Sequence, residues 1–187
     1  MRLLLLGGPG AGKGTQAQPI VARFGLTHLG SGDMLRREVA LGTPTGLAAR
    51  AFMERGDLVP DDIIIRMLMS PMIEAVRGNG YVLDGYPRTV AQAKHGYDVG
   101  KRLGTHVQVV VYLHVPTAEL IQRLLARARG VDDTPEVIAN RIRIFERDTT
   151  PLLEYFSTRG ECVIEIDGSR PVEVVTADIL RALEPLA

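Results

Sequence analysis

The stretch RLLLLGGPGAGKGT, residues 2–15, constrains the fold of this chain more than any other. Its run of leucines predicts a strand buried on both faces, and the glycines that follow let backbone N–H groups turn inward around an anion. A helix that begins near Lys13 adds its positive end, and the lysine side chain reaches toward the outer phosphates. A strand, a glycine-rich loop and a helix in this order predict a phosphate-binding loop in an α/β fold.

The residue after Lys13 departs from the general pattern of phosphate-binding loops, which places Ser or Thr directly after the lysine. Here Gly14 intervenes, and Thr15 comes one position late. A glycine-rich hairpin that binds no ligand is the alternative interpretation, and the flanking strand and helix disfavour it. The loop alone does not name a reaction, because switch GTPases, motor ATPases and small-molecule kinases share it. The chain has no guanine-reading Asn-Lys-x-Asp motif, which disfavours a GTPase.

Short apolar runs alternate with helix-like stretches along the whole chain, which predicts a parallel sheet covered on both faces. Residues 30–59 form a helical excursion from this core, and residues 127–135 form a second, shorter one. The core then comprises 1–29, 60–126 and 136–187. The predicted strands are 2–6, 81–83, 107–113 and 162–166. The predicted helices are 13–24, 31–41, 46–55, 61–77, 90–102, 117–128, 135–157 and 172–184, with N-caps at Ser31, Thr89, Thr117 and Thr134.

The charge balance excludes bulk electrostatic attraction as a function, because basic and acidic residues number 22 each. We therefore expect no nucleic-acid or membrane partner. The one cysteine, Cys162, excludes a cysteine-rich structural zinc site, and it lies in a predicted buried strand. No apolar run approaches the roughly 20 residues that span a bilayer, so we expect a cytoplasmic protein. Nothing in the sequence demands more than a monomer.

A second motif, GYVLDGYPRTVAQA at residues 80–93, supplies groups that face a bound phosphate. A buried strand ends at Asp84, and a carboxylate there holds the waters of a Mg²⁺ ion bound to phosphates. Arg88 projects a guanidinium into the same space. The alternative is a plain strand-to-helix turn with a surface arginine. For Gln92 a helix-capping role with Thr89 competes with a binding role.

Together with the segments that follow, these motifs resemble those of the adenylate kinases. The segments GGPGAGKGTQ, GSGDMLR, GDLVP, LDGYPRTVAQA, VDDTPEVIANR and IDGSRPVEVV occur in that family's order and spacing, over essentially the whole chain. The resemblance implies transfer of a phosphoryl group from MgATP to AMP, giving two ADP. It implies a P-loop fold with a five-stranded parallel sheet, a mobile AMP-binding part at 30–59 and a mobile short lid at about 127–135.

The resemblance also implies roles for individual residues. The implied ATP-binding residues are Gly10, Ala11, Gly12, Lys13, Gly14, Thr15, Arg123, Arg127, Gly168 and Arg170. The implied AMP-binding residues are Ser31, Arg36, Asp57, Leu58, Val59, Gly85, Tyr86, Pro87, Arg88, Gln92, Arg129 and Arg141. The implied catalytic residues are Lys13, Arg88, Arg123, Arg129 and Arg141, with Asp84 binding Mg²⁺ through water.

Two positions depart from the family pattern. Ser31 stands where adenylate kinases usually carry threonine, and pyrimidine monophosphate kinases carry a similar SAGD segment, so a UMP/CMP kinase is the second interpretation. Serine keeps the hydroxyl, and Gln92 favours AMP. Gly130 adds one residue between Arg129 and the paired aspartates, and the role of Arg129 rests on treating it as an insertion.

The arginines suit phosphoryl transfer independently of any family. The acceptor phosphate is already an anionic nucleophile, so the reaction needs alignment and charge neutralisation rather than a general base. One alternative is a solvated basic face paired with Asp132, Asp133 and Glu136. Others are a switch module that hydrolyses nucleotide slowly, or a scaffold with a degenerate site. The arginine-rich lid disfavours the switch, and the intact set of phosphate-binding residues disfavours the scaffold.

Overall fold

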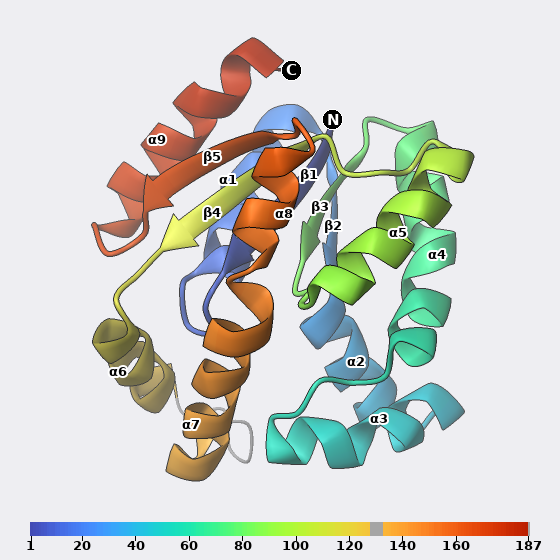
Figure 1. Ribbon diagram of the computed structural model, residues 1–187, viewed down its shortest axis with the longest axis vertical. Coiled ribbons are helices and arrows are strands. Elements are labelled where there is room, and N and C mark those ends of the chain that lie inside the picture. The colour runs from blue at the N-terminus through green and yellow to red at the C-terminus, as the bar shows by residue number, and fades with distance from the viewer. Residues whose placement is uncertain (128–132, 187) are drawn as a thin grey trace.

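A single parallel sheet organises the computed structural model, which describes residues 1–127 and 133–186 (Figure 1). Its strands are β1 (Arg2–Gly7), β2 (Thr27–Gly30), β3 (Tyr81–Asp84), β4 (Val109–His114) and β5 (Cys162–Asp167). Their order is β2-β3-β1-β4-β5, and every neighbouring pair is parallel. The predicted α/β class with a five-stranded parallel sheet is confirmed.

The central strand β1 explains why the sheet needs helices on both faces. Leu3 and Leu5 point into one buried cluster, and Leu4 and Leu6 point into the other. Each is at most 3% exposed, as a strand covered on both sides requires. The first cluster includes side chains of α1 (Lys13–Phe24), α6 (Thr117–Arg127), α7 (Pro135–Ile144) and α9 (Val172–Leu183). The second includes side chains of α2 (Ser31–Ala40), α3 (Pro44–Arg55), α4 (Asp61–Arg77), α5 (Val90–Leu103) and α8 (Leu152–Thr158).

Because the strands are parallel, their carboxyl ends lie along one edge of the sheet, and those of β1, β2 and β3 point to the lower part of Figure 1. The helices α2, α3, α6 and α7 lie in that part of the figure. The predicted excursion at 30–59 contains α2 and α3, which pack against each other. Of the predicted lid, residues 128–132 lie outside the described residues. The parallel sheet therefore directs its loops toward the two segments that the sequence separates from the core.

Two elements differ from the sequence prediction. The strand β2 was not predicted, because its four residues, THLG, are too short to form an apolar run. The predicted helix 135–157 is divided into α7, a π-helical turn at Phe145–Thr149, and α8. In that turn the Thr150 N–H donates to the Phe145 carbonyl at 2.9 Å, and Pro151 follows with no N–H to continue an α-helix.

Two of the four predicted N-caps are confirmed, because the hydroxyls of Thr89 and Thr134 accept bonds from backbone N–H groups three residues on. The other two are wrong. Ser31 is the first helical residue of α2 and makes no cap there, and the Thr117 hydroxyl donates to Glu146.

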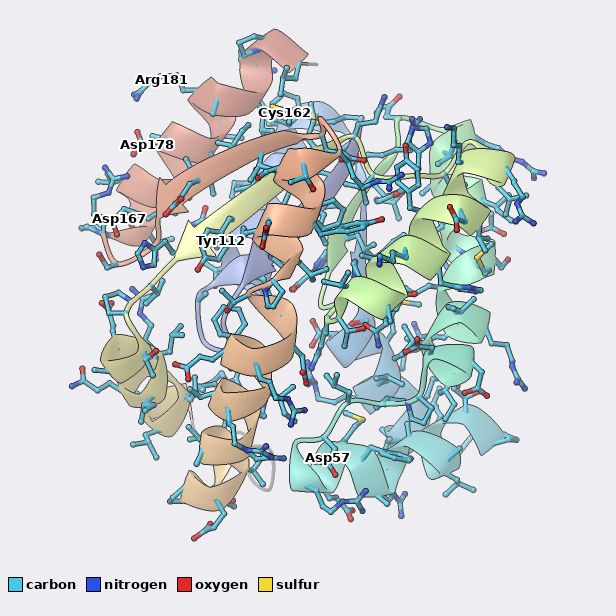
Figure 2. The ribbon with its side chains drawn as sticks, viewed as in Figure 1. Asp57, Tyr112, Cys162, Asp167, Asp178 and Arg181 are labelled. Atoms are coloured by element: carbon cyan, nitrogen blue, oxygen red, sulfur yellow. The ribbon has the colours of Figure 1, made fainter. Side chains whose placement is uncertain are left out.

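The expectation for Cys162 is also wrong. It is exposed, because it begins the edge strand β5 (Figure 2). No helix in the described part of the chain is long and apolar enough to span a bilayer.

Candidate active site

The glycine-rich loop lies between β1 and α1, at the carboxyl end of the sheet. Gly12 is the N-cap of α1 and has φ of +90°, a left-handed conformation that glycine adopts without strain. A Cβ atom there would meet nothing within 4 Å, so the loop backbone at this point faces open space. No side chain caps this helix end, which leaves its positive pole directed at the cavity beside it.

Lys13 is the first residue of α1, and its side chain folds back to the start of this loop. Its Nζ donates to the Gly7 carbonyl at 2.9 Å and to the Gly8 carbonyl at 3.0 Å. Burial lowers the pKa of Lys13 to about 8; Asp84 opposes the shift, and Arg88 adds to it. A lysine held this way in a positive environment gains from an arriving anion, because the anion restores the charge that burial penalises.

Asp84 ends β3, and the register of the sheet pairs it with Leu5, two residues before the end of β1. Its Oδ2 lies 4.0 Å from the position of a Cβ atom on Gly14. Asp84 and Thr15 line the same cavity. Oxygen donors of these two kinds fit Mg²⁺, which prefers one or two protein oxygens and keeps several waters.

Arg127 and Arg141 meet at one buried carboxylate. Arg127 makes a bidentate pair with Asp133, with N···O distances of 2.9 and 2.6 Å. Arg141 approaches the same carboxylate at 3.4 Å, and the Asp133 side chain is fully buried. The two arginines therefore pair with Asp133, as the alternative of a solvated basic face proposed, but the carboxylate that they share is buried rather than solvated. Arg129, the third predicted residue of this region, lies outside the described residues.

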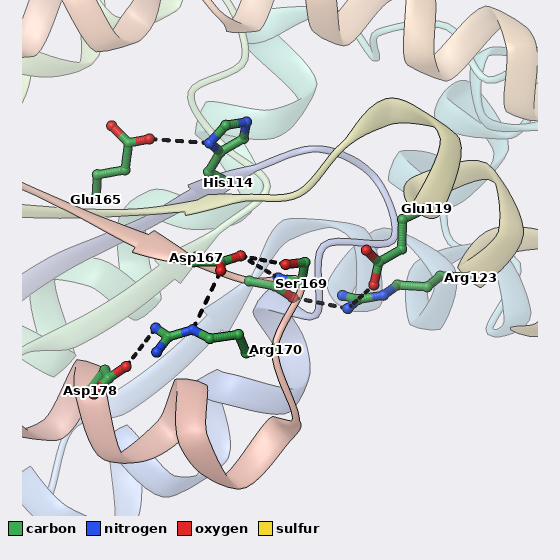
Figure 3. A network of polar contacts seen from close by, with 9 residues as sticks. His114, Glu119, Arg123, Glu165, Asp167, Ser169, Arg170 and Asp178 are labelled. Carbon is green, nitrogen blue, oxygen red and sulfur yellow. Dashed lines mark hydrogen bonds and ion pairs between the residues drawn. The ribbon is translucent and has the colours of Figure 1, made fainter.

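Arg123 of α6 belongs to a second polar network, which Figure 3 shows. Its guanidinium donates to Glu119 at 2.5 Å and to the Gly168 carbonyl at 2.9 Å. Arg170 makes an ion pair with Asp178 of α9 at 2.5 Å. Gly168 and Arg170 line neither of these two cavities, but the Gly168 carbonyl contacts Arg123, which lines the first one.

Arg88 follows β3 and faces the Ser31 end of α2 across Gly85. Its Nε donates to the Gly85 carbonyl at 2.7 Å, and its own carbonyl accepts from the Thr149 hydroxyl at 2.8 Å. Burial lowers the pKa of Arg88, and Asp84 opposes that shift. A Cβ atom on Gly85 would lie 2.6 Å from the Ser31 Oγ, so a side chain has no room at this position.

Gln92 satisfies half of the predicted capping box. Its backbone N–H donates to the Thr89 hydroxyl at 3.1 Å. Its side-chain oxygen accepts from the Arg88 N–H at 2.7 Å, and its side-chain nitrogen donates to Asp61 at 2.6 Å. The side chain therefore does not complete the box, and it lines a cavity instead.

Two adjoining cavities collect most of the predicted site residues. The first contains the phosphate loop, Asp84 and the arginines, and the second lies between α2, the end of α3 and the turn after β3. Of the predicted residues, the first is lined by Gly10, Gly12, Lys13, Gly14, Thr15, Arg36, Asp84, Gly85, Pro87, Arg88, Arg123, Arg127 and Arg141. The second is lined by Ser31, Arg36, Asp57, Leu58, Val59, Gly85, Tyr86, Arg88, Gln92 and Arg141. Ala11 lines neither cavity and is 3% exposed.

The excursion that carries α3 touches α7 at the mouth of these cavities. The Asn140 side chain donates to the Arg55 carbonyl at 2.8 Å and to Asp57 at 2.9 Å. The bonds from Arg55 and Asn140 lower the pKa of Asp57, which Figure 2 labels. A Cβ atom on Gly56 would lie 2.9 Å from Arg141 Cγ, so the backbone of the excursion approaches α7 closely here.

Sequence reasoning missed several residues of the site. The sequence indicated Asp133 only as a partner of solvated arginines, although its buried carboxylate pairs with both Arg127 and Arg141. Thr149 and Phe145 line the first cavity because the π-helical turn carries them there. Asp61 supports Gln92 from the start of α4. The proline at 151 was the one available signal for the turn, since it interrupts the predicted helix.

Comparison with known proteins agrees with this geometry. The family model described as "Adenylate kinase" matches residues 5–161. The adenylate kinase of Nitrobacter hamburgensis is 45% identical, over 98% of this chain and 92% of the relative. That of Methylobacterium radiotolerans is 44% identical, over 99% and 96%. That of Stenotrophomonas maltophilia is 40% identical, over 98% and 100%. The chain therefore belongs to the adenylate kinase family.

Proposed function

We propose that this chain reversibly transfers a phosphoryl group from MgATP to AMP, giving two ADP. The observation that carries the proposal is the pair of adjoining cavities, whose shared wall includes Arg36, Arg88 and Arg141. One cavity has the phosphate loop and the other has Ser31 and Gln92. Two nucleotides bound in this way place their phosphates next to one another, among guanidinium groups.

The proposed chemistry is alignment with charge neutralisation. In the first cavity the loop N–H groups and Lys13 hold the phosphates of ATP, and Arg123 and Arg127 bind them from α6. Arg88 and Arg141 hold the AMP phosphate and offset the repulsion between the two anions. The AMP phosphate oxygen attacks directly, so the site needs no side chain to take a proton. By analogy with arginine fingers, one such cation contributes about 10³–10⁵ in rate.

We propose that Asp84 and Thr15 hold the magnesium ion that accompanies ATP, Asp84 through water. The ion, when bound, neutralises negative charge on the phosphate oxygens. Asp84 also lies close enough to Lys13 to favour its charged form. Asp84 and Lys13 therefore make the first cavity suited to a polyphosphate that binds together with a magnesium ion.

We further propose that the chain has three parts: the core, an AMP-binding excursion at 30–59 and a short lid at about 127–135. Exclusion of water at closure prevents ATP from being hydrolysed in place of AMP phosphorylation. Ser31, Arg36, the backbone at Asp57–Val59 and Gln92 bind AMP in this scheme. We also propose that the protein is a cytoplasmic monomer that binds ATP, AMP and ADP. Its reaction would maintain the balance of adenine nucleotides.

A coupled assay for ADP formation tests the proposal. Purified protein is given MgATP with AMP, UMP, CMP or GMP, and with no acceptor. We expect rapid ADP formation with AMP alone among these acceptors. Preference for UMP or CMP would indicate a pyrimidine monophosphate kinase. Phosphate release at the same rate with and without an acceptor would indicate a switch module and would refute the transferase proposal.

A further inference from the structure

Gln92 is fixed by two neighbours of opposite hydrogen-bonding character. Its Oε1 accepts from the Arg88 backbone N–H, which can only donate. Its Nε2 donates to Asp61 Oδ1, which as a carboxylate can only accept. Rotating the amide by half a turn would place Nε2 against the Arg88 N–H, so that two donors meet. It would also place Oε1 against the Asp61 carboxylate, so that two acceptors meet. The pair therefore fixes which end of the amide carries oxygen and which carries nitrogen.

Fixing the amide determines what it can bind in the second cavity, which Gln92 lines. After these two bonds the side chain keeps one N–H and one oxygen lone pair, in a set order along the cavity wall. Adenine presents a donor at N6 beside an acceptor at N1, and hypoxanthine presents the reverse at the same two positions. An amide that rotates freely suits both bases, whereas a fixed amide suits one.

We propose that Asp61 is a positioning residue that makes the AMP pocket selective for adenine by fixing the amide of Gln92. This inference rests on the proposed function. Asp61 itself lines neither cavity, so it acts through Gln92 rather than on the base. Burial raises the pKa of Tyr86 to about 12, and the Asp61 charge contributes to that shift, which places the carboxylate next to this wall of the pocket.

Asp61 begins α4, where a carboxylate also stabilises the helix dipole, and this general role needs a control. Asp62 provides one. It lies in the same first turn and makes an exposed ion pair with Arg66 at 3.5 Å. The N-cap, Pro60, has no side-chain cap bond, and Asp61 directs its oxygen to Gln92. The two aspartates thus share the stabilising effect on the helix dipole, whereas Asp61 accepts the bond from Gln92 and Asp62 pairs with Arg66.

The experiment measures kcat/KM for AMP and for IMP, at saturating MgATP, in a set of variants. In Asp61→Ala we expect the AMP-to-IMP ratio to fall about five- to tenfold, the value of one hydrogen bond to a charged but exposed group. Asp61→Ser should behave alike, and it keeps a residue suited to a helix start if the alanine variant does not fold. Asp61→Asn, whose carbonyl still accepts from Nε2, should stay within about twofold of the wild type.

Two further comparisons separate positioning from a structural role. Asp62→Ala should leave the ratio unchanged. Asp61→Ala should have no additional effect on the ratio in a Gln92→Ala background, because a residue that acts only through Gln92 loses its effect with it. An unchanged ratio in folded Asp61→Ala and Asp61→Ser, an equal fall in Asp62→Ala, or additive effects would overturn the inference alone. Failure of the wild type to use AMP would overturn the proposed function as well.

Discussion

Replacing Gly85 with alanine tests a close approach between the turn after β3 and the excursion. Gly85 has φ of +83°, and its added Cβ would lie 2.6 Å from Ser31 Oγ and 3.4 Å from an Arg88 nitrogen. The left-handed backbone costs alanine about 1–2 kcal/mol. The overpacking adds about 1–3 kcal/mol. We therefore expect Gly85→Ala to lower the free energy of unfolding by about 2–5 kcal/mol.

Gly104 supplies the matched control for this variant. It has φ of +69° at the end of α5, and a Cβ atom there would meet nothing within 4 Å. Gly104→Ala should therefore show the backbone penalty of about 1–2 kcal/mol and no overpacking. The difference between the two variants isolates the contact with Ser31. In the background of Ser31→Ala, which removes the hydroxyl oxygen, the overpacking part of the Gly85→Ala effect should largely disappear.

Guanidinium-induced unfolding and thermal unfolding measure these differences. For a domain of this size about 1 kcal/mol corresponds to about 2–4 °C in Tm, so Gly85→Ala should lower Tm by about 4–20 °C. Its kcat/KM for AMP should fall, while ATP binding measured alone stays near the wild-type value. If Gly85→Ala were no less stable than Gly104→Ala, the proposed contact with Ser31 would be wrong.

Three other predictions concern the charged groups. In the absence of nucleotide the unfolded chain binds more protons than the native protein between pH 8 and 10.5, because the Lys13 pKa falls from 10.5 to about 8 on folding. The free energy of unfolding should rise across that range by about 3 kcal/mol relative to Lys13→Met, measured by denaturant titration at several pH values. Arg88→Ala should lower kcat about 10³-fold with its circular dichroism spectrum unchanged, whereas the exposed Arg66→Ala should leave kcat near the wild-type value. Asp133→Ala should lower the free energy of unfolding by about 3–5 kcal/mol, because it removes the buried carboxylate that Arg127 contacts; a loss under 1 kcal/mol would show that this pair behaves as an exposed one.

The sequence predicted the part of the site that local patterns determine. The leucines of β1 and the glycines that follow specify a buried strand and a loop with special backbone angles. The proximity of Asp84 to that loop then follows from topology, because parallel strands end at the same edge of a sheet. The predicted roles of Gly168 and Arg170 came from the resemblance alone. In the structure Arg170 makes an ion pair with Asp178 of α9, a contact that no local pattern encodes.

The missed features share one physical cause, which is that they depend on contacts between distant segments. The strand β2 has only four residues, and its pairing with β3 defines it more than its composition does. Gln92 fits a capping box in sequence, yet its oxygen accepts from Arg88, and Asp61, 31 residues away, binds its nitrogen. Cys162 lies in an apolar run but at the sheet edge, where the strand order leaves it exposed.

The cations of the site already have acceptors supplied by the protein, and this shapes how it would bind phosphate. Lys13 donates to loop carbonyls, Arg88 to the Gly85 carbonyl, and Arg127 to Asp133. Such contacts hold the side chains near the cavity, which reduces the conformational entropy lost on binding. These contacts also disfavour weakly charged ligands, because such a ligand gains little free energy by replacing an acceptor that the protein already supplies. A polyphosphate, with several charged oxygens, is the kind of ligand that this arrangement favours.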